Sequence, residues 1–73
     1  MAELVKFRKV GDGLVKVEIW GDFIDDCGVM DVGDMTPFLR SLKFIATTPE
    51  EVIQELREGK DLDRYIGTRK HRS

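Results

Sequence analysis

Two side chains of this sequence could act as a nucleophile or a base, Cys27 and His71. A cysteine thiol becomes a nucleophile when a neighbouring base or cation lowers its pKa, and a second cysteine would be needed for a disulfide or a shared metal site. The chain has no second cysteine, and its one histidine belongs to a terminal segment that cannot hold a base in fixed geometry. We therefore expect no catalytic residue, and we expect Cys27 to be a small residue packed at a loop.

A cluster of aspartates is the next candidate for chemistry, because carboxylates ligate calcium. Five lie between residues 21 and 39, a stretch without a lysine or arginine: Asp22, Asp25, Asp26, Asp31 and Asp34. Their spacing lacks the EF-hand order of alternate acids, a central Gly and a terminal Glu. We predict a solvated acidic segment with no metal. This segment also repels nucleic-acid phosphates, which makes nucleic-acid binding unfavourable outside the basic residues 69–72.

Two glycine-bearing motifs complete the candidates. Asp22 stands between Gly21 and Phe23, where its carboxylate could accept backbone amides and stabilise a turn, and no second group is available for acid–base chemistry. Residues 11–13 (Gly-Asp-Gly) lack the Gly-x-x-x-x-Gly-Lys order of a phosphate-binding loop and the helix that should follow it. Both motifs are therefore interpreted as turns.

The elements that position these residues begin with a hairpin over residues 3–20. Val5 and Phe7 alternate with Lys6 and Arg8, residues 14–20 resume the alternation, and the Gly-Asp-Gly between them suits a tight turn. Trp20 falls on the polar face of its strand. Either a helix covers that face, or Trp20 is an exposed aromatic of the kind enriched at interfaces.

Residues 25–34 contain turn residues without a sustained period, so we predict a loop that could include a short strand near residues 29–32. Thr36, as a cap, and Pro37 then open a short helix. Its predicted apolar stripe consists of Phe38, Leu42 and Ile45.

A second helix should run from Pro49 to about Glu58. Thr48 and Glu51 have capping-box spacing before its buried stripe. Gly59 suits its C-terminal cap, and the apolar residues of the segment 62–66 predict one further helical turn.

These elements predict an α+β fold, a small antiparallel sheet built on the N-terminal hairpin with two helices packed on one face. A chain of 73 residues has room for one domain, here residues 1–67, followed by a basic flexible tail at 68–73. No apolar run approaches ~20 residues and no signal-peptide pattern opens the chain, so we expect a soluble cytoplasmic protein. The 36% charged content, without asparagine, is a bias seen in proteins from hot environments.

Residues 17–24 (Val-Glu-Ile-Trp-Gly-Asp-Phe-Ile) resemble the strand ending in Gly-Asp-Phe-Phe of the small C-terminal accessory domain of lipoate–protein ligases. As in that family, a hairpin precedes this motif and a helix with apolar residues four apart, Phe38 and Leu42, follows it. Residues 61–67 (Asp-Leu-Asp-Arg-Tyr-Ile-Gly) resemble the family's Asp-Leu-x-x-Tyr-Phe-Gly. Three features depart from the pattern: Ile24 replaces the second Phe, residues 25–34 are longer than usual, and the Gly common after the first helix is replaced near Phe44.

The resemblance spans residues 4–67 and implies a protein that is not an enzyme by itself. In the family, the lysine that activates lipoate with ATP belongs to a separate catalytic domain, and a stand-alone small domain is similar to an accessory subunit that supports formation of lipoyl-AMP. The implied partners are the catalytic subunit and, indirectly, lipoyl-acceptor domains. Lipoate and ATP belong to the complex, and no cofactor is expected on this chain alone. The implied signature residues are Gly21, Asp22, Phe23, Tyr65 and Gly67, and Trp20, Phe23 and Phe38 are the candidate partner contacts or supports.

Two alternatives remain. The small domain is distantly similar to iron–sulfur scaffold proteins, which use several cysteines where this chain offers only Cys27. A small regulatory or nucleic-acid-binding protein acting through the basic tail is the other alternative.

Overall fold

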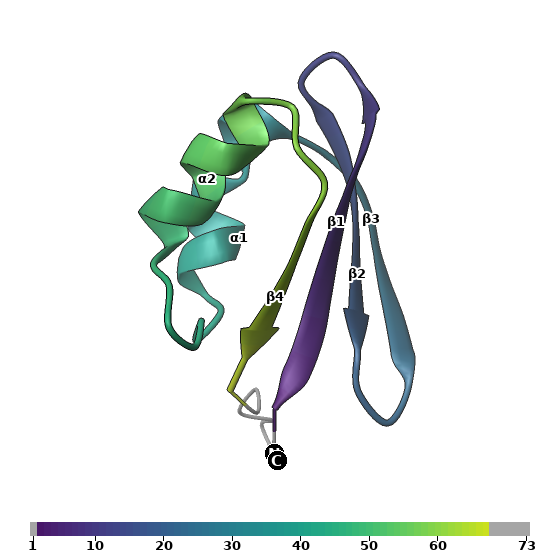
Figure 1. Ribbon diagram of the computed structural model, residues 1–73. Coiled ribbons are helices and arrows are strands. Elements are labelled where there is room, and N and C mark those ends of the chain that lie inside the picture. Colours follow the sequence, from purple (N-terminus) through teal and green to yellow (C-terminus); the bar gives the residue numbers. More distant parts are fainter. Residues whose placement is uncertain (1, 68–73) are drawn as a thin grey trace.

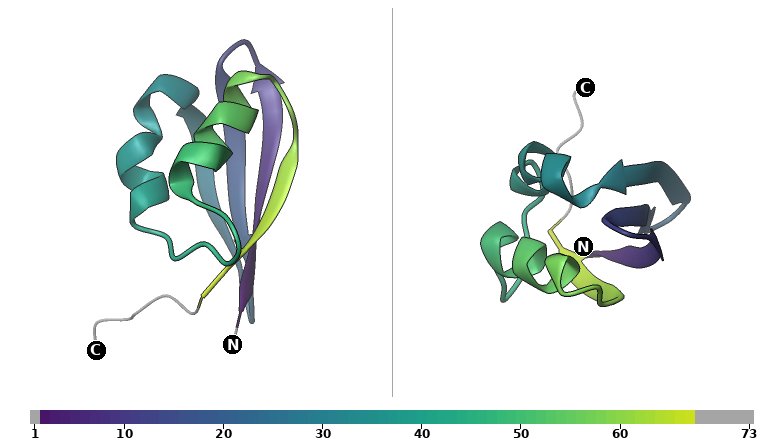
Figure 2. Two further views of the ribbon diagram at one scale, coloured as in Figure 1. Left: turned by 60° about the vertical axis from the view of Figure 1, so that its left-hand side comes forward. Right: turned by 90° about the horizontal axis from the view of Figure 1, so that it is seen from above.

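The computed structural model describes residues 2–67, which form a four-stranded antiparallel sheet with its helices on one face (Figures 1 and 2). The predicted α+β class is confirmed. The strands stand in the order β3-β2-β1-β4. In chain order the elements are β1 (Glu3–Gly11), β2 (Leu14–Trp20), β3 (Ile24–Asp31), the 3-10 turn η1 (Val32–Asp34), α1 (Thr36–Arg40), α2 (Pro49–Arg57) and β4 (Leu62–Ile66). The predicted tail, with His71, lies outside the described residues.

The hairpin predicted over residues 3–20 is confirmed. Val5 pairs with Ile19 and Phe7 with Val17, so the alternating apolar residues of β1 and β2 share the face that the helices cover. Gly13 has φ +67°, the left-handed conformation that a tight turn after Asp12 requires. The fully buried side chains of Val5, Phe7 and Ile19 pack against Met35 and Leu39 from the helical layer and, from α2, Val52 and Leu56.

Residues 25–34 were predicted as a loop that could include a short strand near residues 29–32; a strand is present, but it is longer and starts earlier, because most of the segment forms the edge strand β3. β3 pairs with β2 along its length and contains a β-bulge opposite Val17 and Glu18, where Gly28 has φ +81°. The extra residue of a bulge shifts the alternation of side chains by one position. Ile24 and Val29 therefore lie on the same face despite odd spacing, which explains why no period was visible.

The first helix begins where Thr36 and Pro37 predicted it, but two of its details are wrong. Met35 occupies the N-cap position without a side-chain hydrogen bond, and Thr36 lies inside the helix. Because α1 ends at Arg40, its buried residue is Leu39, and Phe38 is half-buried. The other two residues of the predicted stripe lie beyond the helix: Leu42 is buried in the core, and Ile45 has about half of its surface exposed.

The capping box of α2 is confirmed: Glu51 N donates to Thr48 Oγ1 over 3.2 Å, and Thr48 N donates to Glu51 Oε1 over 3.4 Å. Gly59, with φ +82°, ends the turn after the helix through its N–H bond to Leu56 O.

The helical turn predicted at 62–66 is wrong, because these residues form β4, which pairs with β1. Leu62 and Ile66 are buried, Arg64 lies between them with an ion pair to Glu55, and Tyr65 lies on the opposite face. The apolar residues at positions 62, 65 and 66 have the spacing of one helical turn, but only Leu62 and Ile66 are buried in the core.

Candidate functional site

The face of the sheet opposite the helices is open, and one end of it carries an apolar row with one residue from each strand. Tyr65 of β4 pairs with Leu4 of β1, Leu4 pairs with Trp20 of β2, and Trp20 pairs with Ile24 of β3. Tyr65, Trp20 and Ile24 are 59%, 40% and 54% exposed. A contiguous apolar surface that crosses a whole sheet is unusual for a face turned to water, and such surfaces mark interaction sites. We call these four residues the apolar row.

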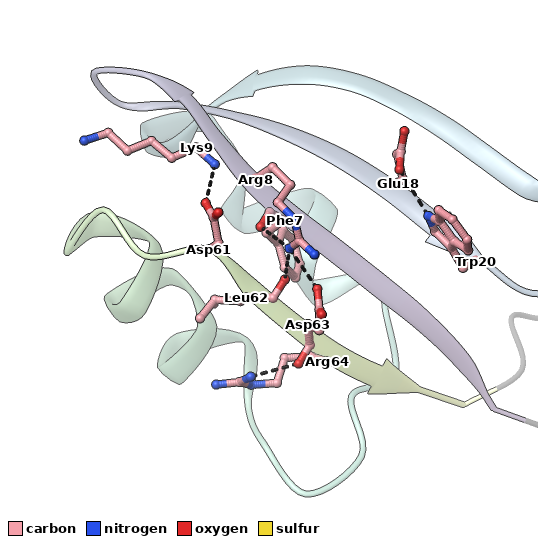
Figure 3. Close-up of polar contacts among 9 residues, drawn as sticks. All are labelled: Phe7, Arg8, Lys9, Glu18, Trp20, Asp61, Leu62, Asp63 and Arg64. Carbon is pink, nitrogen blue, oxygen red and sulfur yellow. Dashed lines mark hydrogen bonds and ion pairs between the residues drawn. The ribbon is translucent and has the colours of Figure 1, made fainter.

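Trp20 is held in place by two polar neighbours on the same face. Its Nε1 donates to Glu18 Oε1 over 3.1 Å (Figure 3), and Lys6 Nζ lies 4.6 Å from the centre of its ring, within cation–π range. No described helix covers this face, so of the two possibilities for Trp20 the structure has the exposed aromatic. An aromatic side chain already ordered in the free protein loses little entropy when a partner covers it.

The signature Gly21-Asp22-Phe23 forms the turn between β2 and β3, next to the apolar row. Gly21 N donates to Phe23 O over 3.0 Å, and the Phe23 side chain is 82% exposed. Within residues 2–67 the Asp22 carboxylate accepts no backbone hydrogen bond, so the predicted role of its side chain in stabilising the turn is wrong.

Other aspartates of the acidic segment stabilise turns instead. Asp26 Oδ1 accepts from Gly28 N and Asp31 Oδ1 accepts from Gly33 N, both over 2.8 Å. These are bonds from a side chain to the backbone two residues on, a geometry that aspartate favours. Asp26 thereby supports the bulge of β3, and Asp31 supports the start of η1.

Beside the apolar row runs a second row of charged residues with both signs. Arg8 Nη1 donates to Asp63 Oδ1 over 2.8 Å and to the carbonyl oxygens of Phe7 and Leu62 (Figure 3). This hydrogen bond from Arg8 lowers the pKa of the Asp63 carboxyl, and the same bond raises the pKa of Arg8. The pairings place three cations and four anions on the open face: Lys6, Arg8, Lys16, Glu18, Asp26, Asp31 and Asp63. With a small excess of negative charge this face offers no positive field for a nucleic-acid backbone.

The structure brings together Trp20, Phe23 and Tyr65 at one end of the sheet, but not Phe38. Phe38 belongs to α1 and is half-buried against the core, in the layer on the other side of the sheet. Gly67 N donates to Lys43 O over 2.7 Å and so helps to fasten the end of β4. Sequence reasoning did not single out Leu4 and Ile24 as site residues. The alternation of the hairpin, which puts Leu4 on the face of Trp20, could have identified the first of them.

Two other features of the described residues are less specific. Cys27 is half-buried within the bulge of β3, not in a loop, and no three His, Cys, Asp or Glu side chains of residues 2–67 gather in a way that could hold a metal ion. A hollow of about 410 Å³ lies between the β1–β2 turn and the end of α2, and its lining includes Lys9, Asp31, Arg57 and Gly59. Its mixed charges do not select a class of ligand.

None of the helices in the described part of the chain is both long enough and apolar enough to cross a bilayer. Comparison of the chain with known protein families, with curated proteins and with solved structures finds no match.

Proposed function

We propose that this chain is a non-catalytic accessory subunit that binds the catalytic subunit of a lipoate–protein ligase through the open face of its sheet and supports lipoyl-AMP formation. The observation that carries the proposal is the apolar row, with Phe23 exposed beside it and Trp20 ordered within it. Trp and Tyr are the residues that most often contribute the largest share of binding energy at protein interfaces. The identity of the partner comes from the resemblance of residues 17–24 and 61–67 to the accessory domain.

The dimensions of the sheet indicate how much surface the partner must cover. Strands of five to nine residues, ~3.4 Å per residue and ~4.8 Å apart, give an open face of roughly 500 Å². A standard interface takes about 800 Å² from each partner. The catalytic subunit should therefore cover the open face together with the Phe23 turn and one edge of the sheet.

This role needs no catalytic group in the chain, because in the resembled family the activating lysine and the sites for lipoate and ATP belong to the catalytic subunit. The lipoyl-acceptor domain would meet this chain only indirectly, through the complex. We place the complex in the cytoplasm, where lipoate, ATP and the apo acceptor are available together.

Reconstitution tests the proposal. A catalytic subunit that lacks its own accessory domain is mixed with lipoate, ATP and an apo acceptor domain, and lipoyl-AMP and lipoylated acceptor are measured with and without this chain. We expect the chain to stimulate lipoyl-AMP formation, and the Trp20→Ala/Phe23→Ala variant to lose most of the stimulation. Gln54→Ala is the control, because Gln54 is exposed on α2, in the layer on the other side of the sheet. Equal lipoyl-AMP formation with and without the chain would refute the proposal.

A further inference from the structure

The two edges of the sheet differ in whether another segment pairs with their outer backbone groups. The segment 43–45 covers the outer side of β4 at its C-terminal end: Ile45 N donates to Tyr65 O over 3.0 Å, Gly67 N donates to Lys43 O, and Phe44 forms a bridge with Ile66. β3, at the other edge (Figure 1), has no strand of residues 2–67 on its outer side. Because an edge strand presents unpaired N–H and C=O groups, proteins usually shorten or cover it. β3 is eight residues long and carries a bulge and three aspartates, and no strand of residues 2–67 pairs with its outer side.

The side chains of β3 show what kind of strand would fit beside it. Ile24 and Val29 are more than half exposed on the open face. Asp25, Asp26 and Asp31 are exposed along the same strand, and no lysine or arginine occurs between residues 21 and 39. Asp26 and Asp31 each hydrogen bond a backbone amide, yet neither forms an ion pair within residues 2–67. The edge is therefore acidic and partly apolar.

These charges argue against a second copy of the chain as the occupant. If β3 paired antiparallel with β3 of another copy, three aspartates of each strand would face a strand with three aspartates. Like charges across neighbouring strands are destabilising. On the open face the apolar Ile24 and Val29 alternate with Asp26 and Asp31. A strand that presents apolar side chains beside the first pair and lysine or arginine beside the second, all on one face, would instead satisfy the backbone groups, these aspartates and the exposed apolar residues together.

We propose that β3 is the docking site for an extended, lysine- or arginine-rich segment of the partner protein, which adds to the sheet as a fifth strand. In strand addition, backbone hydrogen bonds provide affinity and the alternate side chains provide specificity. The added strand would also extend the apolar row beyond Ile24, since Ile24 is its last member on this side. The inference rests on the proposed function for the identity of the partner.

The test uses a synthetic peptide of about ten residues in which lysine and valine alternate along one face of the strand and threonine occupies the other face, added to the isotope-labelled full chain. Amide exchange and chemical shifts are followed by NMR. We expect slower exchange at β3 amides and shifts at residues 24–31. Two control peptides should produce neither effect: one has glutamate in place of lysine, and one has alternate amides N-methylated so that it cannot pair as a strand. Peptide shifts confined to Trp20 and Tyr65 without protection of β3 would overturn the proposal.

The matched variant replaces Asp26 and Asp31 with asparagine. Asn keeps an acceptor oxygen for Gly28 N and Gly33 N and removes only the charge, so the variant should fold. Because two exposed charge pairs are lost, we expect the lysine peptide to bind roughly fivefold more weakly at low salt. Unchanged affinity for the peptide would refute the charge argument. Slow exchange at β3 that appears without peptide and increases with the concentration of the chain would also refute it, because a second copy would then be the occupant. A chain ending at residue 67 checks the basic tail as occupant: slow β3 exchange that speeds up on truncation would overturn the assignment to a partner.

The two proposals fail separately. If the lysine peptide protects β3 while the chain has no effect on lipoyl-AMP formation, the partner is not the ligase and the docking edge stands. If the chain stimulates the ligase and the double asparagine variant does so with the same affinity for the catalytic subunit, the accessory function stands and the docking edge is wrong.

Discussion

Replacing Trp20 with alanine should weaken partner binding far more than it weakens the fold. In the free chain Trp20 makes one exposed hydrogen bond and one exposed cation–π contact. These contribute about 0.5–1.5 and ~0.5–1 kcal/mol. Since Trp20 is 40% exposed and outside the core, we expect the free energy of unfolding to fall by about 1–2 kcal/mol, against ~3–5 kcal/mol for a tryptophan removed from a core.

At an interface the same change should cost more. A buried aromatic contact point typically contributes at least ~2 kcal/mol, a loss of affinity of about 30-fold. Unfolding of the variant does not account for this loss of affinity. Even if the wild type has only ~5 kcal/mol of stability, the variant retains about 3 kcal/mol, and less than ~1% of it is unfolded. The reduction in affinity from that source is negligible.

Calorimetric titration with the catalytic subunit, paired with urea unfolding of the free chain, measures both quantities. Trp20→Phe keeps an aromatic ring and should retain most of the affinity, and Gln54→Ala, exposed on α2 on the other side of the sheet, should behave as wild type. If Trp20→Ala binds within twofold of wild type, the apolar row is not the interface.

Three further outcomes follow from the fold and are measured by denaturant unfolding. Gly28→Ala should lose about 1–2 kcal/mol although no atom crowds the added methyl, because φ is +81°; a loss below ~0.5 kcal/mol would mean that the bulge adjusts easily. Leu39→Ala should cost ~3–5 kcal/mol and Phe38→Ala clearly less, since Leu39 is fully buried; the reverse order would contradict the packing of α1. The Arg8 pair lowers the pKa of Asp63, so its contribution is complete above the ordinary aspartate value of about 3.9 and is lost as the pH falls through the lowered value. Asp63→Asn should therefore lose up to ~1 kcal/mol at pH 7, limited by solvent screening, and should decline less between pH 4 and 2; an unchanged acid limb would contradict the pair.

Local signals predicted the parts of this fold that depend on neighbours in sequence. The hairpin needs only alternation and a turn, and the start of α2 needs only Thr48, Pro49 and Glu51, which cap it within four residues. Residues 62–66 could not be predicted in this way, because the apolar positions fit a helical turn as well as a strand. What decides for the strand is pairing with β1, more than fifty residues earlier in the chain.

The site was predictable to the extent that it lies on the hairpin. Trp20 was recognised as an aromatic on the polar face of a strand, and Phe23 came from the resemblance. Tyr65 lies on the same face only because residues 62–66 form a strand that pairs with β1, and Ile24 lies there only because β3 pairs with β2. The apolar row is thus a product of the sheet order, which no single stretch of the chain encodes.

The bulge at Gly28 connects the fold to both proposed contacts. If β3 continued from Ile24 in strict alternation, Met30 would lie on the open face and Asp31 would face the core, where an unpaired carboxylate is costly. The extra residue reverses this, so that Met30 pairs with Val15 on the covered face and Asp31 stays exposed. It also leaves Val29 on the open face beside the acidic edge. The segment 25–34 therefore provides the charged edge and, at Val29, an apolar side chain on the open face, and differences in partner choice should arise in this segment.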